Sequence, residues 1–203
     1  MHMETEPVLP WYERLRAAAR STLYGWIEPL AARAVRFGLT PNRITTAGCL
    51  LSILAAGLVY LGYWGVAGAV FLFAGGLDML DGAVARNYGQ ATRFGALLDS
   101  TLDRIGEGAL FIAVALHYTH SKPLLFATLM AWFTSLLTSY VRARTEGLGG
   151  VCSEGWITRP ERVILLAAGL MFGGLEVVVW LLAAGGGFTV AQRLWLSRRG
   201  FVR

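Results

Sequence analysis

The chain has 203 residues, of which 55% are hydrophobic, and it carries a net charge of +5. Its mean hydropathy of +0.52 is too apolar for an ordinary soluble domain and indicates a helical membrane protein. At about 20 apolar residues per crossing, about six spans fill such a chain and leave no room for a separate soluble catalytic domain. The Arg residues lie at the ends of the expected spans and form no soluble basic face, which excludes nucleic acid as the expected partner.

Residues 1–40 are predicted to form an N-terminal segment at the cytoplasmic face of the membrane. The first ten residues are polar and acidic and lack the pattern of a cleaved signal peptide. Residues 11–39 mix apolar side chains with five Arg, and Trp11 and Trp26 lie among them. This mixture is typical of an amphipathic helix that lies on the membrane surface without crossing it.

Six apolar segments follow and are predicted to cross the bilayer as helices. They lie near residues 43–63, 65–86, 93–118, 122–146, 160–174 and 176–197. The fifth segment is the shortest. Residues 41–203 are therefore expected to form one six-helix domain, and the chain is predicted to be an all-α integral membrane protein.

The distribution of charge predicts how these helices are oriented. Under this layout almost all Arg side chains fall on one side of the membrane, whereas the opposite loops carry only Lys122 and Glu176 as charges. Positive charge marks the cytoplasmic side. The sequence therefore predicts a multi-pass protein of the cell membrane, in contact with lipid, with both termini in the cytoplasm.

The four Asp of the chain lie within one short stretch, in or beside predicted spans: Asp78, Asp81, Asp99 and Asp103. A carboxylate at membrane depth is costly, so it marks a functional site by default. Each pair has helical spacing, so its two members share a helix face. The two helices are consecutive, and a turn near residues 87–91 should place both pairs at comparable depth near the cytoplasmic end. We expect the four carboxylates to face one another across one helix–helix seam.

Four clustered carboxylates cannot all stay ionised without positive charge, so divalent cations are predicted at this site. A cluster of oxygen ligands alone suits Mg²⁺ or Mn²⁺ better than zinc. Two such metals per site can bridge phosphate oxygens during an in-line displacement. Gly82 and Gly95 would let a helix backbone or a nucleotide approach closely, and Arg86 lies where it can pair with a phosphate.

These residues form a pattern of eight fixed positions with fixed gaps. It reads Asp78-x2-Asp81-Gly82-x2-Ala85-Arg86-x8-Gly95-x3-Asp99-x3-Asp103. At every position and gap it resembles the signature of the CDP-alcohol phosphotransferase family. The upstream stretch Leu39-Thr40-Pro41-Asn42-x2-Thr45 also resembles the entry to that family's first span.

The resemblance implies a six-helix homodimer that transfers a phosphatidyl-type group from a CDP-linked lipid to an alcohol. An alcohol oxygen would attack the β-phosphate and CMP would leave. The four Asp would surround the metals, and Asp103 would also be the catalytic general base. The resemblance places the remaining motif residues, with Asp78 and Asp81, in the CDP-binding site: Asn42, Thr45, Gly82, Ala85, Arg86 and Gly95.

Two further stretches bear on the acceptor alcohol. Residues 139–147 and Arg159-Pro160-Glu161-Arg162 resemble the branch of the family that makes phosphatidylinositol phosphate, or its archaeal ether-lipid counterpart. The implied acceptor is inositol phosphate. Three guanidinium groups are candidates to hold its phosphate: Arg142, Arg162 and Arg193. The other interpretation is that these inner-face Arg residues serve only membrane topology.

Other functions fit parts of the pattern. Glycerol 3-phosphate is the chief alternative acceptor for the same reaction. A membrane prenyltransferase also uses paired Asp motifs with Mg²⁺, but those motifs lie on well-separated helices. A divalent-cation transporter would place its carboxylates near the middle of the membrane with access from both faces, whereas this cluster is expected near one face.

Overall fold

The structure is a computed structural model that describes residues 25–152 and 155–201. Within these residues the chain is helical and contains no strand. A helical segment at residues 25–36 comes first. The long helices are α2 (Pro41–Tyr60), α3 (Trp64–Asn87), α4 (Arg93–His117), α5 (Lys122–Gly147), α6 (Arg159–Phe172) and α7 (Leu175–Phe201). They agree closely with the six predicted segments, whereas residues 11–24 of the predicted surface helix lie outside the described residues.

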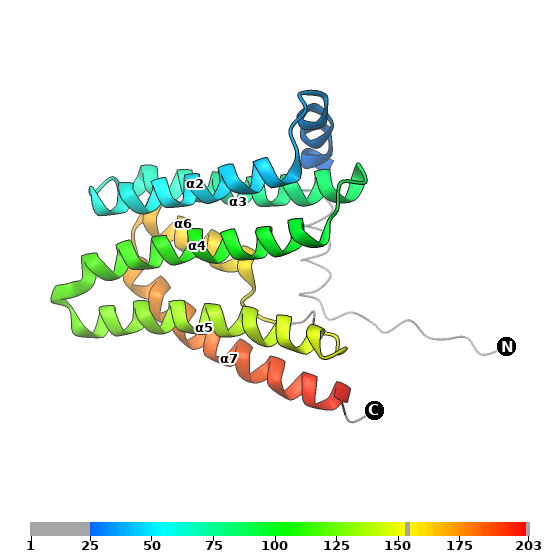
Figure 1. The fold of residues 1–203 in the computed structure, drawn as a ribbon. Coiled ribbons are helices and arrows are strands. Elements are labelled where there is room, and N and C mark those ends of the chain that lie inside the picture. Colours follow the sequence, from blue (N-terminus) through cyan, green and yellow to red (C-terminus); the bar gives the residue numbers. More distant parts are fainter. Residues whose placement is uncertain (1–24, 153–154, 202–203) are drawn as a thin grey trace.

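The six helices run roughly parallel or antiparallel to one another in a bundle (Figure 1). The helical segment 25–36 lies across one end of that bundle. The α3–α4 turn, the end of α5 and the C-terminal end of α7 lie at the same end (Figure 1). This is the end to which the sequence assigns most of the Arg side chains.

Four of the helices are long and apolar enough to cross a membrane: α2, α3, α5 and residues Leu175–Arg198 of α7. Helix α4 falls short because it carries several charges, among them Asp99, Asp103 and Glu107. Helix α6 has only 14 residues, and a helix of that length spans about 21 Å, less than a hydrocarbon core of about 30 Å. Within the described residues, six helices thus form the bundle, and four of them are candidate membrane spans.

The ends of α6 follow from local sequence signals. Thr158 and Glu161 form a capping box, in which the Thr158 amide donates to Glu161 Oε2 at 2.9 Å. Gly173 ends the helix with a φ of 85°, a conformation that glycine adopts without strain. Helix α6 lies close to α3, since a Cβ added to Gly68 would lie 2.7 Å from the backbone oxygen of Ala167.

The helical segment 25–36 packs against the bundle along one face. Ile27, Ala31 and Ala34 are buried against a small cluster that includes Ile44 of α2 and Val84 of α3. On the outer side, large apolar residues are exposed, notably Trp26 at 74% and Phe37, just after the helix, at 82%. The segment therefore presents apolar surface to its surroundings as well as to the core.

Helix α2 separates the two helices that carry the Asp residues. It packs against both α3 and α4, whereas the backbones of α3 and α4 approach each other closely at very few positions. The two helices are therefore not packed together along one seam, although three of the four carboxylates still face one another. Small residues allow α2 to fill this position: a Cβ added to Gly106 of α4 would lie only 2.7 Å from Cβ of Ser52 on α2.

Candidate active site

Three carboxylates converge in the space beside α2. One oxygen each from Asp78 on α3 and from Asp99 and Asp103 on α4 can be chosen so that all three lie within 4.8 Å of one another. Asp78 lies about 14 Å from the end of α3, and Asp103 about 15 Å from the start of α4, at 1.5 Å per residue. The helices thus bring the two pairs to comparable depth, as their spacing along the sequence predicts.

Asp81 has a different environment. Its side chain is buried and accepts a hydrogen bond from the Thr45 hydroxyl of α2 at 2.5 Å. It lies outside the group formed by the other three carboxylates. The contact brings together two residues that the motif assigns to the CDP site, and it attaches Asp81 to α2.

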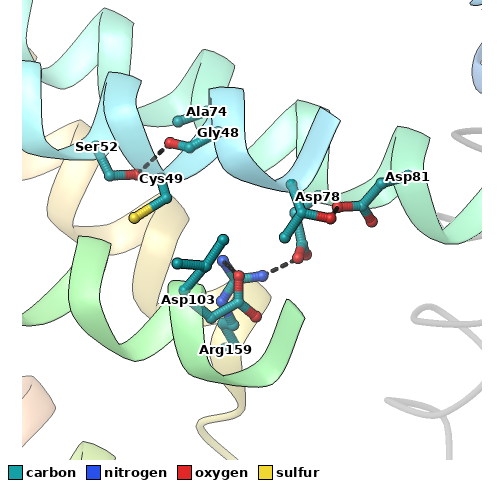
Figure 2. A pocket seen from close by; sticks show the side chains of 10 residues that line it. Gly48, Cys49, Ser52, Ala74, Asp78, Asp81, Asp103 and Arg159 are labelled. Carbon is teal, nitrogen blue, oxygen red and sulfur yellow. Dashed lines mark hydrogen bonds and ion pairs between the residues drawn. The ribbon is translucent and has the colours of Figure 1, made fainter. Parts of the chain in front are cut away.

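Arg159, in the first turn of α6, lies between Asp78 and Asp103 (Figure 2). One guanidinium nitrogen pairs with Asp78 Oδ2, and another contacts Asp103 Oδ1 at 2.6 Å. Sequence reasoning did not place Arg159 in the site. One feature of the sequence could have identified it. Arg159 follows the capping residue of a helix too short to span a membrane, and such a helix can begin at the depth of the Asp cluster.

These residues line one pocket (Figure 2). Its α2 wall consists of small side chains, namely Thr45, Gly48, Cys49 and Ser52. Its charged wall consists of Asp78, Asp81, Asp103 and Arg159. The small residues leave the carboxylates accessible where a larger α2 side chain would cover them.

The cluster suits a divalent cation. Asp99 Oδ1 is buried and has no hydrogen-bond partner among the described residues, which is costly for a carboxylate oxygen. All three converging groups are carboxylates, the ligand type that Mg²⁺ and Mn²⁺ prefer. The residues present therefore fit such an ion. The three carboxylates can bind phosphate oxygens only when a cation lies between the two groups.

Two motif glycines permit close approaches near the turn that joins α3 and α4. A Cβ added to Gly82 would lie 3.0 and 3.1 Å from the guanidinium nitrogens of Arg86, so this side chain folds back over the glycine. A Cβ added to Gly95 would lie 3.1 Å from Asn42 Oδ1. Asn42 of α2 and Gly95 of α4 thus meet, as expected for residues of one site. Ala85 is half-buried in the last turn of α3.

Comparison with known proteins decides the family. Residues 38–191 match the family model described as CDP-alcohol phosphatidyltransferase. The chain belongs to this family. It is 41% identical over 193 residues to a phosphatidylinositol phosphate synthase of Mycobacteroides abscessus, covering 89% of this chain and 87% of the relative. It is 39% identical over 183 residues to an archaetidylinositol phosphate synthase of Methanothermobacter thermautotrophicus, covering 86% and 90%.

Solved structures from the same family are similar in fold. The phosphatidylinositol phosphate synthase of Mycobacterium tuberculosis with CDP-DAG bound has a TM-score of 0.77 at 38% identity, covering 84% of this chain and 92% of that chain. The same enzyme in complex with manganese and citrate has a TM-score of 0.76 at 38% identity, covering 84% and 88%. The chain is therefore a CDP-alcohol phosphatidyltransferase, as the eight-position motif indicates.

The three Arg residues predicted to bind the acceptor phosphate have separate partners in this family member. Arg142 is exposed on α5 and pairs with Glu146 at 2.8 Å. Arg193 is buried on α7 and donates to the backbone oxygen of Thr138 at 2.7 Å. Arg162 is buried on α6 and presents its guanidinium fork to another residue, which leaves fewer of its N–H groups for a ligand.

That partner is Glu107 of α4, which is itself buried. Arg162 donates to its two carboxylate oxygens at 2.7 and 3.1 Å, and Ser135 of α5 donates to one of them at 3.1 Å. Glu107 and Arg162 lie far apart in the sequence, so nothing in the local pattern pairs them. Arg104, three residues before Glu107 on α4, donates to the backbone oxygen of Ser100.

Proposed function

We propose that this enzyme transfers a phosphatidyl-type group from a CDP-linked lipid to inositol phosphate and releases CMP. The convergence of Asp78, Asp99 and Asp103 beside the CDP motif carries this proposal. The relatives named for phosphatidylinositol phosphate and archaetidylinositol phosphate synthesis support the acceptor. The related structure with CDP-DAG bound supports the lipid donor.

The carboxylate cluster would be the metal site. One or two Mg²⁺ or Mn²⁺ ions, when bound, would neutralise the carboxylates and supply positive charge for the phosphates of the CDP-linked lipid. The related structure in complex with manganese supports this assignment. Asp78, Asp99 and Asp103 would be direct ligands. Asp81, held by Thr45, would complete the set from the CDP side, as the motif implies.

Asp103 would act as the general base. Its carboxylate lines the pocket, and one of its oxygens contacts Arg159, which orients it. The acceptor hydroxyl would lose its proton to Asp103 as its oxygen attacks the β-phosphate. The CDP half of the donor would lie against Asn42, Thr45, Gly82, Ala85 and Gly95, with the Arg86 guanidinium on a phosphate.

The acceptor phosphate would be held by Arg142 and Arg193, on the neighbouring helices α5 and α7. The exposed Arg142 pairs with Glu146, in an i, i+4 contact that a doubly charged phosphate can replace. Arg162 would support the pocket through Glu107, with its remaining N–H groups directed at the ligand.

The enzyme would lie in the cell membrane as a homodimer, with its site open to the cytoplasm. Residues 1–40 would rest on that membrane face and residues 41–203 would form the membrane domain. The outward Trp26 and Phe37 support the first part, because aromatic side chains favour the interface between lipid and water. The charge asymmetry of the loops supports the orientation.

The test is release of CMP from CDP-diacylglycerol and CDP-archaeol by the purified enzyme with Mg²⁺. Inositol phosphate, glycerol 3-phosphate, serine and inositol are compared as acceptors in one assay, with the Asp103→Asn variant as the blank. We expect the fastest release with inositol phosphate. A preference for glycerol 3-phosphate would show that it, and not inositol phosphate, is the acceptor. Metal flux into vesicles without CMP release would refute the enzyme assignment.

A further inference from the structure

Arg159 occupies a position that its contact with the general base Asp103 does not fully explain, because it also pairs with Asp78. It enters the carboxylate cluster from α6, although α3 and α4 supply all the acidic residues there. Its guanidinium contacts Asp78 and Asp103, which are two of the three groups that fit a cation. A guanidinium N–H and a metal ion bind the same carboxylate lone pairs, and both carry positive charge.

The backbone of Arg159 is fixed from both directions. The capping box of Thr158 and Glu161 holds the start of α6. One turn later, the buried Arg162 is bound by both oxygens of Glu107. The backbone at Arg159 therefore cannot move away from the cluster without loss of the buried Arg162–Glu107 ion pair. Any movement of the Arg159 guanidinium must come from rotation of its side chain.

The side chain itself has room to move. It is 29% exposed, in contrast to 4% for Arg162. Asp78 and Asp103 are also partly exposed, at 28% and 14%. Water and ions can therefore reach this contact, and Arg159 can release a carboxylate without uncovering a buried charge.

We propose that Arg159 is a positioning residue that competes with the divalent cation for Asp78 and Asp103 and thereby sets the affinity of the metal site. The guanidinium holds the two carboxylates at a fixed separation across the gap between α3 and α4. It yields at least one of them when a cation binds. This inference rests on the proposed function in one respect, namely that the carboxylate cluster is the metal site.

The test measures Mn²⁺ binding to the metal-depleted enzyme by electron paramagnetic resonance, without any turnover. The Arg159→Gln variant is compared with wild type and with Arg198→Gln, which removes the same charge from an exposed position on α7. Loss of one competing charge-assisted contact should tighten Mn²⁺ binding by about tenfold. The control should bind Mn²⁺ as wild type does.

A second readout is thermal unfolding with and without Mn²⁺. Without the ion, Arg159→Gln should unfold at a lower temperature than wild type, since Asp78 and Asp103 lose their shared partner. With Mn²⁺, its melting temperature should rise by more than that of wild type. If the Gln variant does not fold, Arg159→Lys keeps the charge but cannot hold both carboxylates, and it should also bind Mn²⁺ more tightly than wild type.

The outcomes separate the two proposals. Mn²⁺ affinity in Arg159→Gln or Arg159→Lys that is equal to or weaker than in wild type overturns the competition. That result stands only if wild type binds Mn²⁺ and Asp99→Asn binds it weakly. If wild type does not bind Mn²⁺, or Asp99→Asn binds it equally well, the metal site itself is refuted, and the competition with it.

Discussion

Glu107 and Arg162 form a buried ion pair between α4 and α6, with contacts of 2.7 and 3.1 Å. It stands in register with the pair of Asp103 and Arg159, because Glu107 follows Asp103 by one turn of α4 and Arg162 follows Arg159 by one turn of α6. Two Arg–carboxylate pairs therefore join the same two helices. The inner pair is enclosed by the bundle, and the outer pair faces the pocket.

Removal of one member of the Glu107–Arg162 pair should strongly destabilise the fold. In Glu107→Gln the buried Arg162 charge loses its counter-ion, and such a loss typically costs about 3–5 kcal/mol. We expect a large drop in the unfolding temperature in detergent. The double variant Glu107→Leu/Arg162→Leu should recover much of it because no unpaired charge remains. Equal destabilisation of single and double variants would show that the pair matters by its shape alone.

Replacement of Asp103 by Asn should remove the general base. We expect CMP release to fall by about 10²- to 10⁴-fold, the usual contribution of a positioned base, while the CDP-lipid still binds. Rates are measured at saturating acceptor, and donor binding by protection against heat. Near wild-type turnover in Asp103→Asn would exclude Asp103 as the base.

Removal of divalent cations should abolish turnover reversibly. Chelation by EDTA followed by addition of Mn²⁺ or Mg²⁺ should restore CMP release, because the carboxylates cannot bind phosphate oxygens directly. Asp99→Asn should require at least about tenfold more Mn²⁺ for half-maximal activity, since even partners outside the ligand shell typically contribute about 10- to 100-fold. Full activity in EDTA would contradict the metal site.

A methyl group at Gly95 should disturb the CDP site. In Gly95→Ala the new Cβ would lie 2.9 Å from Thr92 Oγ1 and 3.1 Å from Asn42 Oδ1, so the cap of α4 and the Asn42 side chain must shift. We expect a higher KM for the CDP-lipid, by about tenfold for one lost donor contact. Gly57→Ala is the matched control, because a Cβ there meets nothing within 4 Å and alanine favours the helix. An unchanged KM in Gly95→Ala would remove Gly95 from the donor site.

Sequence reasoning predicted the helices and the depth of the Asp residues well. Apolar segment lengths, Gly and Pro breaks and helical spacing are local, and they placed Asp78 and Asp103 at matching depth. These features depend on neighbours along the chain, so a single sequence carries them. The meeting of Asn42 with Gly95, which are distant in the sequence, was expected only because both belong to the family motif.

The packing order of the helices was not predictable in the same way. Consecutive helices usually pack together, so α3 and α4 were expected to form one seam. Whether α2 enters between them depends on Gly48, Ser52 and Gly106, and those small residues are common in any membrane helix. Arg159 and the pairing of Glu107 with Arg162 were missed for the same reason, since both join α4 to a helix distant in sequence.

Helix α2 packs between α3 and α4 and shapes the site without supplying any of its acidic residues. The helix has no carboxylate of its own, yet its small side chains form one wall of the pocket that contains Asp78 and Asp103. Uncharged substitutions at Gly48, Cys49 or Ser52 should therefore change the space beside Asp78 and Asp103. Redesign of the enzyme for a larger cation or donor would begin on this spacer helix and leave every acidic residue in place.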